Sequence, residues 1–129
     1  MSRLRPRSDA GQATVEVALT LPVVVVVLLA VVQVALVARD DLVVLHAARE
    51  GARAAALAPG GSDPTGAAEV AARHGAGHLA PTRLRVEVAV GARLVTVTVH
   101  YRAPTDVPAV GALVGDVDLE ASVTMQREP

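Results

Sequence analysis

The stretch GQATVEVALTLPVVVVVLLAVVQVALVA, residues 11–38, decides the fold of this chain. From Val17 to Ala38 no side chain is charged, and the aliphatic pattern is interrupted only at Thr20, Pro22 and Gln33. A helix that crosses a bilayer needs about 20 mostly apolar residues, so this run is long enough. About a dozen Val and Leu residues near the helix centre contribute on the order of −5 kcal/mol to insertion, which exceeds the cost of the interruptions. The stretch therefore predicts a transmembrane helix.

Two other interpretations of this stretch stay open. A buried core helix is also apolar all round, but a chain of 129 residues offers little protein to surround one. A secretory signal that is removed whole has an apolar core of about 7–15 residues, shorter than this run. Its small-x-small cleavage pattern occurs at residues 56–58, which lie far from the span and directly before Pro59.

The charges on either side of the run predict its orientation. Three arginines precede it, at Arg3, Arg5 and Arg7, whereas residues 39–41 read Arg-Asp-Asp and have no positive excess. Because positive flanks favour the cytoplasmic side, we expect the N-terminus in the cytoplasm and the C-terminal part outside it.

Composition narrows the class of protein. The net charge is −1 and Tyr101 is the only aromatic residue, so neither a basic field nor base stacking favours a nucleic-acid partner. The chain has no cysteine, which excludes disulfides and thiolate metal sites. A core without Phe or Trp must consist of Val, Leu and Ala.

The helical pattern continues beyond the span, from Leu42 to Leu57. One stripe of apolar residues is expected to face the rest of the protein: Leu42, Leu45, Ala48, Ala52 and Ala56. We expect the membrane helix to extend into this amphipathic segment, which would pack on a globular domain. The last three stripe residues form a small-xxx-small series, which serves either close approach of helices or an Ala-rich core face.

A Pro- and Gly-rich turn at residues 59–64 ends that helix. Thr65 is the expected cap of a second, short helix that runs through Ala72 and frays near Gly75. Three segments with strict alternation follow, at residues 82–90, 93–102 and 117–126.

Alternation over three segments predicts an antiparallel sheet with one buried face, on which Val97 lies, and one exposed face, on which Thr98 lies. The helix from Leu42 to Leu57 is the natural cover for the buried face. The predicted class is therefore α+β, with a long N-terminal helix packed on a small three-stranded sheet. The connection 103–116 is apolar at Val107, Val110, Leu113 and Val114, and either folds back on the core or touches a partner.

Nothing in the sequence supports catalysis. His74 and His78 have a zinc-binding spacing, but two glycines weaken the helix there and no third ligand is evident. The acids at 116, 118 and 120 suggest a calcium cluster, but Asp118 and Glu120 lie on the exposed face of a strand and are better explained by pairing with Arg83, Arg85 or Arg102 across the sheet. No serine lies in a nucleophile elbow and no lysine follows a glycine-rich loop. We expect no enzyme activity, cofactor, metal or small-molecule substrate.

Glu16 is the one candidate for a functional charge. An ionisable residue at the head of a membrane span is costly and is a functional hypothesis by default. The alternative is an acid in the first turn of the helix, where the helix dipole favours negative charge.

The residues around Glu16 resemble a known family. Residues 11–19, GQATVEVAL, followed by Leu21-Pro22, are similar to the start of TadE-like proteins, the pseudopilins of tight-adherence (Flp-type) pili. Residues 47–54, AAREGARA, match the second hallmark of that family and contain its helix-packing motif: Ala48, Arg49, Glu50, Gly51, Ala52 and Arg53. The first motif is shared with type IV pilins generally, and the two in this order are fairly specific.

The resemblance implies a pilin-like architecture and a class III signal. A prepilin peptidase would cut after Gly11 and leave Gln12 as the new N-terminus, with the hydrophobic helix still attached. Glu16 corresponds to the pilin glutamate that aids cleavage or subunit docking. Val17 departs from the family, which usually has an aromatic residue there, and this departure bears on incorporation into a filament more than on processing. Major pilins of this class are much shorter, so the resemblance fits a minor pilin or assembly factor better.

The expected organisation is a cytoplasmic leader (1–11), a transmembrane helix (12–41) and an extracytoplasmic α+β domain (42–129). The expected location is the cell membrane, in a single pass, with the prepilin peptidase, other pilins and pilus assembly proteins as partners. The competing hypothesis is a membrane-anchored extracytoplasmic binding module whose N-terminus is never cut. A small exported enzyme is a third hypothesis with little support.

Overall fold

The computed structural model describes residues 8–128; the three arginines at positions 3, 5 and 7 lie outside the described residues. The elements in chain order are α1 (Ser8–Ala56), α2 (Pro64–Gly75), the 3-10 turn η1 (Pro81–Arg83), β1 (Leu84–Val90), β2 (Leu94–Ala103), α3 (Gly111–Val114) and β3 (Val117–Gln126). The predicted α+β class, a long apolar helix followed by a three-stranded antiparallel sheet, is confirmed.

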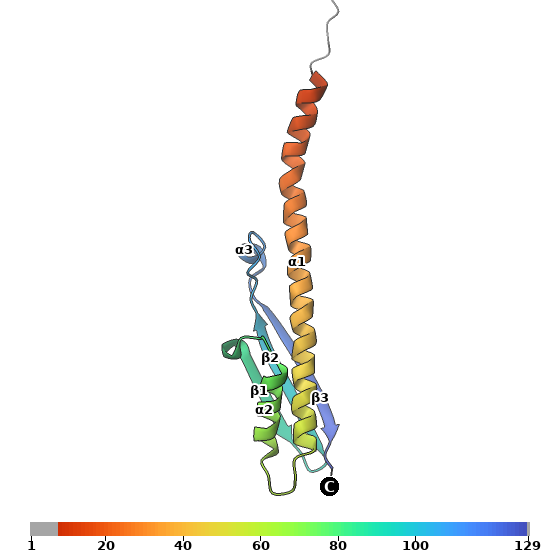
Figure 1. The fold of residues 1–129 in the computed structure, drawn as a ribbon, viewed down its shortest axis with the longest axis vertical. Helices are drawn as coiled ribbons and strands as arrows, with labels where there is room; N and C mark the ends of the chain where they lie inside the picture. Colours follow the sequence, from red (N-terminus) through yellow and green to blue (C-terminus); the bar gives the residue numbers. More distant parts are fainter. Residues whose placement is uncertain (1–7, 129) are drawn as a thin grey trace, which may run out of the picture.

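Helix α1 is a single helix of 49 residues. At 1.5 Å per residue it is about 74 Å long, and its N-terminal part extends far beyond the sheet (Figure 1). Pro22 lies inside it without ending it. The helix continues from the apolar run into the segment that packs on the domain, as the sequence predicts.

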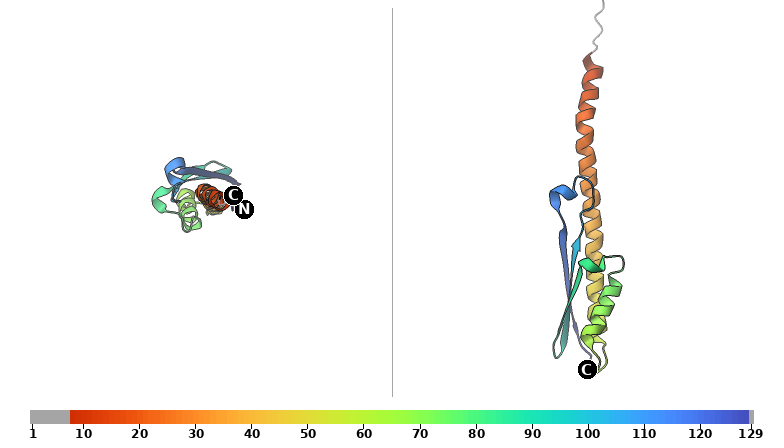
Figure 2. Two further views of the ribbon diagram at one scale, coloured as in Figure 1. Left: turned by 90° about the horizontal axis from the view of Figure 1, so that it is seen from above. Right: turned by 90° about the vertical axis from the view of Figure 1, so that its left-hand side faces the viewer.

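The three strands form an antiparallel sheet in the order β1-β2-β3. Residue Val97 of the central strand lies opposite Val88 on one side and Val123 on the other. One face of the sheet is covered by α1 and α2 (Figure 2). The central strand alternates as predicted, with four side chains buried on the covered face: Val95, Val97, Val99 and Tyr101.

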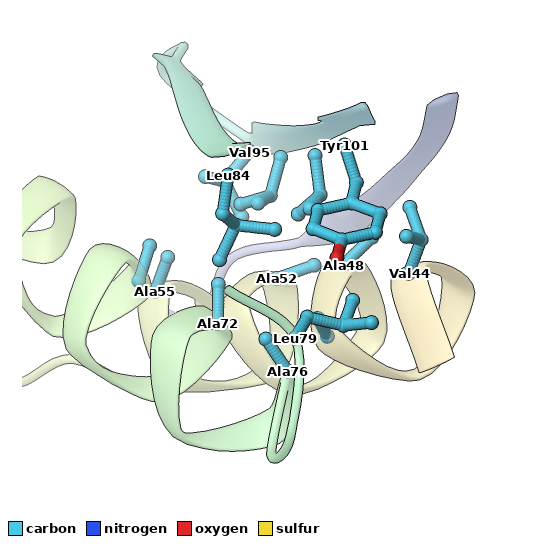
Figure 3. Packing of buried hydrophobic residues seen from close by; sticks show 14 of the residues in the cluster. Val44, Ala48, Ala52, Ala55, Ala72, Ala76, Leu79, Leu84, Val95 and Tyr101 are labelled. Atoms are coloured by element: carbon cyan, nitrogen blue, oxygen red, sulfur yellow. The ribbon is translucent and has the colours of Figure 1, made fainter. Parts of the chain in front are cut away.

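The core lies between that sheet face and the two helices (Figure 3). It is built from Ala, Val and a few Leu residues, and the ring of Tyr101 lies over α1 beside Val44 and Ala48. Small side chains on both helices let α2 pack closely on α1.

The buried stripe of α1 differs from the predicted one. Leu42 is 68% exposed and Leu45 only half-buried, whereas Val44 is fully buried. The fully buried residues recur at helical spacing on a face rotated from the predicted stripe: Val44, Ala47, Ala48, Ala52 and Ala55. Two layers, α2 and the sheet, cover this face together, so the buried surface is centred between them.

Helix α2 begins differently from the prediction. Asp63 is the N-cap, not Thr65: its carboxylate accepts the backbone N–H groups of Thr65 and Gly66, each at 3.0 Å. Pro64 occupies the first helical position, where its missing N–H costs nothing. The helix runs to Gly75, three residues beyond Ala72.

The strand boundaries agree with the sequence within two residues. The first strand starts at Leu84 rather than at residue 82, because residues 81–83 form a 3-10 turn. Val90, expected on the buried face, is 40% exposed, since it lies next to the hairpin at the end of the sheet where α1 stops (Figure 1).

Candidate functional site

The predicted processing and docking residues lie on the free N-terminal part of α1. Gly11, Gln12 and Glu16 are all exposed, and the Gly11–Gln12 peptide bond lies inside the helix, which begins at Ser8. A Cβ added at Gly11 would meet no atom within 4 Å. The Glu16 carbonyl accepts the Thr20 hydroxyl at 2.7 Å, while its carboxylate lies on the helix surface.

Spacing places Gln12 and Glu16 on one side of the helix. Residues four apart lie nearly above one another, separated by a rise of about 6 Å. The acid would therefore stand one turn above a new amino terminus at Gln12. An acid near a helix N-terminus is also favoured by the helix dipole.

The surface around these residues is apolar and uncovered. Residues 11–28 are all exposed, and only 6% of the most apolar 18-residue window of α1 is buried. A core helix would be surrounded by its own chain, so the core-helix interpretation is wrong for this segment. One helix of the described chain, α1, is long and apolar enough to cross a membrane.

Gln33 breaks this pattern in a way that the sequence does not reveal. Its side chain is 5% exposed, whereas Val32 and Val34 beside it are 50% and 68% exposed. Neither amide atom of Gln33 has a hydrogen-bond partner among the described residues. A polar residue in an apolar run indicates a cost of insertion into lipid, but the sequence does not show that this one is buried.

The helix-packing motif lies at the other end of α1, where α1, α2 and β2 meet. Ala48, Gly51 and Ala52 are buried, Glu50 is half-buried, and the two arginines at 49 and 53 are exposed. A Cβ at Gly51 would lie 3.0 Å from the Ala68 carbonyl oxygen and 3.1 Å from Val97 Cγ1. The small-residue series therefore packs within the chain's own core, and the motif alternates inward small residues with outward charges.

Gly51 gives a direct test of this packing. Gly51→Leu should destabilise the domain by about 3 kcal/mol or more, because the side chain must push apart α2 and β2. Arg49→Leu, at an exposed position of the same helix, is the matched control and should change stability by about 0.5 kcal/mol or less. Denaturant unfolding of the full chain in detergent compares the two, and equal stability would refute the close packing at Gly51.

The exposed face of the sheet holds paired charges. Asp118 accepts from Arg102 Nε at 3.1 Å, Asp116 from Arg83 at 3.0 Å, and His100 Nδ1 lies 3.2 Å from Glu120. The hydrogen bond that Arg102 donates to Asp118 and, as the second cause, the negative charge of Asp118 raise the pKa of the Arg102 guanidinium above its ordinary value. Asp118 pairs with an arginine across the sheet as the sequence predicts, whereas Glu120 lies beside His100, and the pairing of Asp116 with Arg83 was not predicted. Within residues 8–128 no three metal-ligating side chains gather.

The two histidines with zinc-like spacing make separate contacts. His78 Nε2 lies 3.5 Å from Asp40 Oδ1 of α1. His74 lines a shallow groove between α1 and α2, together with His46 and Glu50. Helix α2 ends at Gly75 and Gly77 has φ +55°, so the two histidines do not share a helix face.

The comparison with protein families decides the identity of this segment. Residues 11–53 match the family model described as TadE-like protein. They form a TadE-like segment. The resemblance seen in the sequence is thus confirmed, for a third of the chain. No curated protein and no solved structure matches the chain.

The TadE-like segment coincides with α1, from the proposed cleavage position to the packing motif. It joins the uncovered apolar part of the helix to the part that closes the core. The match associates the protein with tight-adherence pili and with a structural family, and the apolar helix supports attachment to a membrane.

Proposed function

We propose that this protein is a minor pilin, pseudopilin or assembly factor of a tight-adherence (Flp-type) pilus or a related secretion system, with a structural role and no catalysis. The observation that carries the proposal is that the TadE-like segment forms one helix, apolar and uncovered at one end and packed into an α+β domain at the other. Such a helix can lie in a membrane or in a bundle of like helices while it carries the domain outside.

The proposed organisation keeps three parts: a leader at 1–11, a membrane helix at 12–41 and an extracytoplasmic domain at 42–129. The described helix passes through the second boundary without a break, so the domain is held rigidly on its anchor. The N-terminus faces the cytoplasm in this proposal, in a single pass.

Removal by an ordinary signal peptidase fits this fold poorly. Its candidate site at Ala56-Leu57-Ala58 lies at the C-terminal end of α1, where the Ala56 carbonyl accepts the backbone N–H of Glu128 at 3.2 Å. A cut there would separate the sheet from the helix that supplies six of the sixteen buried core residues. Cleavage after Gly11 by a prepilin peptidase leaves the core intact.

The exposure of Gly11 supports that cleavage. The bond after it lies one turn into α1, so a peptidase must unwind that turn to reach the backbone. Glycine lowers the free-energy cost of unwinding this turn, since it weakens a helix by about 1 kcal/mol relative to alanine.

Glu16 is the proposed docking residue. Once the leader is removed, the ammonium group of Gln12 lies close to the bilayer. In a bundle of such helices the exposed Glu16 carboxylate of one copy can accept from the Gln12 ammonium of a neighbour. A charge-assisted bond is strong where the dielectric is low, so it would offset the cost of the carboxylate and set the axial stagger.

Glu16→Ala should separate assembly from insertion. Insertion should be unchanged, because the substitution removes a charge that is costly in lipid. Association should fall about tenfold or more, since a hydrogen bond to a charged group contributes about 1.5–3 kcal/mol. The measurement is co-purification of two differently tagged copies from membranes, with the intact mass of each. Glu69→Ala, which removes an exposed acid from α2, is the matched control.

The same masses test the proposed function. An N-terminus that starts at Gln12 agrees with a processed pilin-like subunit. An uncut N-terminus favours the anchored binding module instead. Full association by processed Glu16→Ala protein would show that Glu16 is only an acid at the helix start.

A further inference from the structure

The connection between β2 and β3 lies in an unexpected place. It contains α3 and lies beside α1, beyond the end of the sheet and toward the N-terminal part of that helix (Figures 1 and 2). It is thus the part of the domain that reaches furthest along the apolar helix.

The tip of this connection, residues 107–115, has no charged residue, and Asp106 and Asp116 flank it. Val110 turns inward and is 7% exposed, but Leu113 and Val114 are 81% and 61% exposed. The sequence left open whether this loop folds back on the core or touches a partner. In the structure Val110 is buried, whereas the two large side chains of Leu113 and Val114 face outward.

A set of charged contacts marks the level from which the tip projects. Asp40, at the end of the apolar run of α1, pairs with His78 at 3.5 Å. A few residues further on, Arg83 pairs at 3.0 Å with Asp116, the residue that closes the tip. The first contact joins α1, at the end of the apolar run, to the turn before η1, and the second joins η1 to the residue before β3.

The buried side chain of Gln33 shows how far the tip reaches. It lies six residues before Arg39, about 9 Å along the helix axis. Its neighbours in sequence are exposed, so some other segment must cover it. The connection with α3 is the described segment beside that part of α1 in both views (Figures 1 and 2).

These positions indicate which layer of the membrane the tip reaches. The headgroup regions add roughly 5–7 Å on each side of a hydrocarbon core of about 30 Å. If the charges at 39–41 stand at the outer surface of the membrane, a segment about 9 Å closer to its centre reaches the boundary between headgroups and hydrocarbon. An uncharged tip with exposed Leu and Val suits that boundary, where apolar side chains are buried and charged ones are excluded.

We propose that residues 107–115 insert into the outer headgroup layer of the membrane that α1 spans. This inference rests on the proposed membrane anchoring. The tip is a second lipid contact beside the helix, and two contacts fix the tilt of α1 and the face that the sheet turns to its surroundings. Because the tip carries no Lys or Arg, the contact does not depend on anionic lipid.

The chain contains no Trp, so a single introduced Trp reports on one place. The experiment uses Leu113→Trp in the full chain, in phosphatidylcholine vesicles whose acyl chains are brominated either near the headgroup or, in a second set, near the chain ends. Val24→Trp, in the middle of the apolar run, is the control for the span. Leu57→Trp, exposed at the far end of α1, is the control for water. Leu113 is itself exposed, so the substitution leaves the fold intact.

We expect bromine near the headgroup to quench Leu113→Trp and bromine near the chain ends to quench Val24→Trp, both with blue-shifted emission, and neither to change Leu57→Trp. The result should be the same with added anionic lipid. If Val24→Trp is quenched and Leu113→Trp behaves like Leu57→Trp, the tip proposal is overturned while the span stands. If Val24→Trp is not quenched, the anchoring itself fails. A blue shift at Leu113→Trp that disappears on dilution in lipid, without quenching, would identify a second copy as the partner and overturn the lipid contact.

Discussion

Gly11→Val should abolish processing and leave the leader attached to a membrane-inserted protein. A peptidase must bring its catalytic groups to the bond between Gly11 and Gln12, and a residue without a side chain lets the backbone approach closely. A β-branched residue blocks that approach and also stiffens the helical turn that must unwind. The effect would be all-or-none in the mass of the N-terminus.

The structure makes this variant a clean one. A side chain at Gly11 has open space around it, so valine cannot disturb the fold or the core. Ala18→Val, at an exposed position further along α1, makes a similar change in size away from the bond and should be processed normally. Intact mass of both variants from membranes decides the question. Normal cleavage of Gly11→Val would exclude the prepilin interpretation and leave the anchored module in its place.

The parts of this fold that the sequence predicts are those governed by local patterns. The alternation at 117–126 marks β3 with both of its ends, because half-buried and exposed side chains alternate along its whole length. The continuous helix follows from an apolar run that passes into an amphipathic one without Gly or Pro between them. The class follows from these two patterns together.

The features that the sequence missed depend on contacts between distant segments. Val44 rather than Leu42 faces the core, because α2 and the sheet share the cover of α1. The cap at Asp63 was missed because Pro64 takes the first helical position and moves the cap one residue before it. The burial of Gln33 is likewise a tertiary feature, since Val32 and Val34 on either side of it are exposed.

The candidate site divides in the same way. Gly11 and Glu16 are proposed from local spacing and a family pattern, and their exposure is what the structure adds. The role of Gly51 appears only in three dimensions, since the groups that leave it no room belong to α2 and β2. A glycine inside an otherwise helical pattern was the signal available in the sequence.

Val97→Asp should unfold the α+β domain. Val97 is fully buried at the centre of the sheet, and its Cγ1 faces the backbone of Gly51. A carboxylate there has no cation or donor to pair with among the surrounding Ala and Val residues of the core. Burying an unpaired charge costs several kcal/mol, a large part of the total of about 5–15 kcal/mol for a domain.

The control substitution must lie on the exposed face of the same strand, and the register of the sheet decides which position is suitable. Thr98 lies directly opposite Glu87, so Thr98→Asp would place two carboxylates side by side and add its own cost of up to about 1 kcal/mol. Thr96 lies between Ala89 and Thr124, and its hydroxyl is 2.8 Å from that of Thr124. Thr96→Asp therefore loses one exposed hydrogen bond, worth about 1 kcal/mol, and no more.

Hydrogen exchange of the β2 amides, in the full chain in detergent, is the measurement that separates these cases. The membrane part of α1 stays helical in a micelle whether or not the domain is folded, so total helix content would hide the loss. We expect Val97→Asp to remove the protection of β2 and Thr96→Asp to keep it. Equal loss of protection in both variants would contradict the assignment of the buried face, because the two positions are neighbours in sequence and differ only in the side of the sheet they occupy.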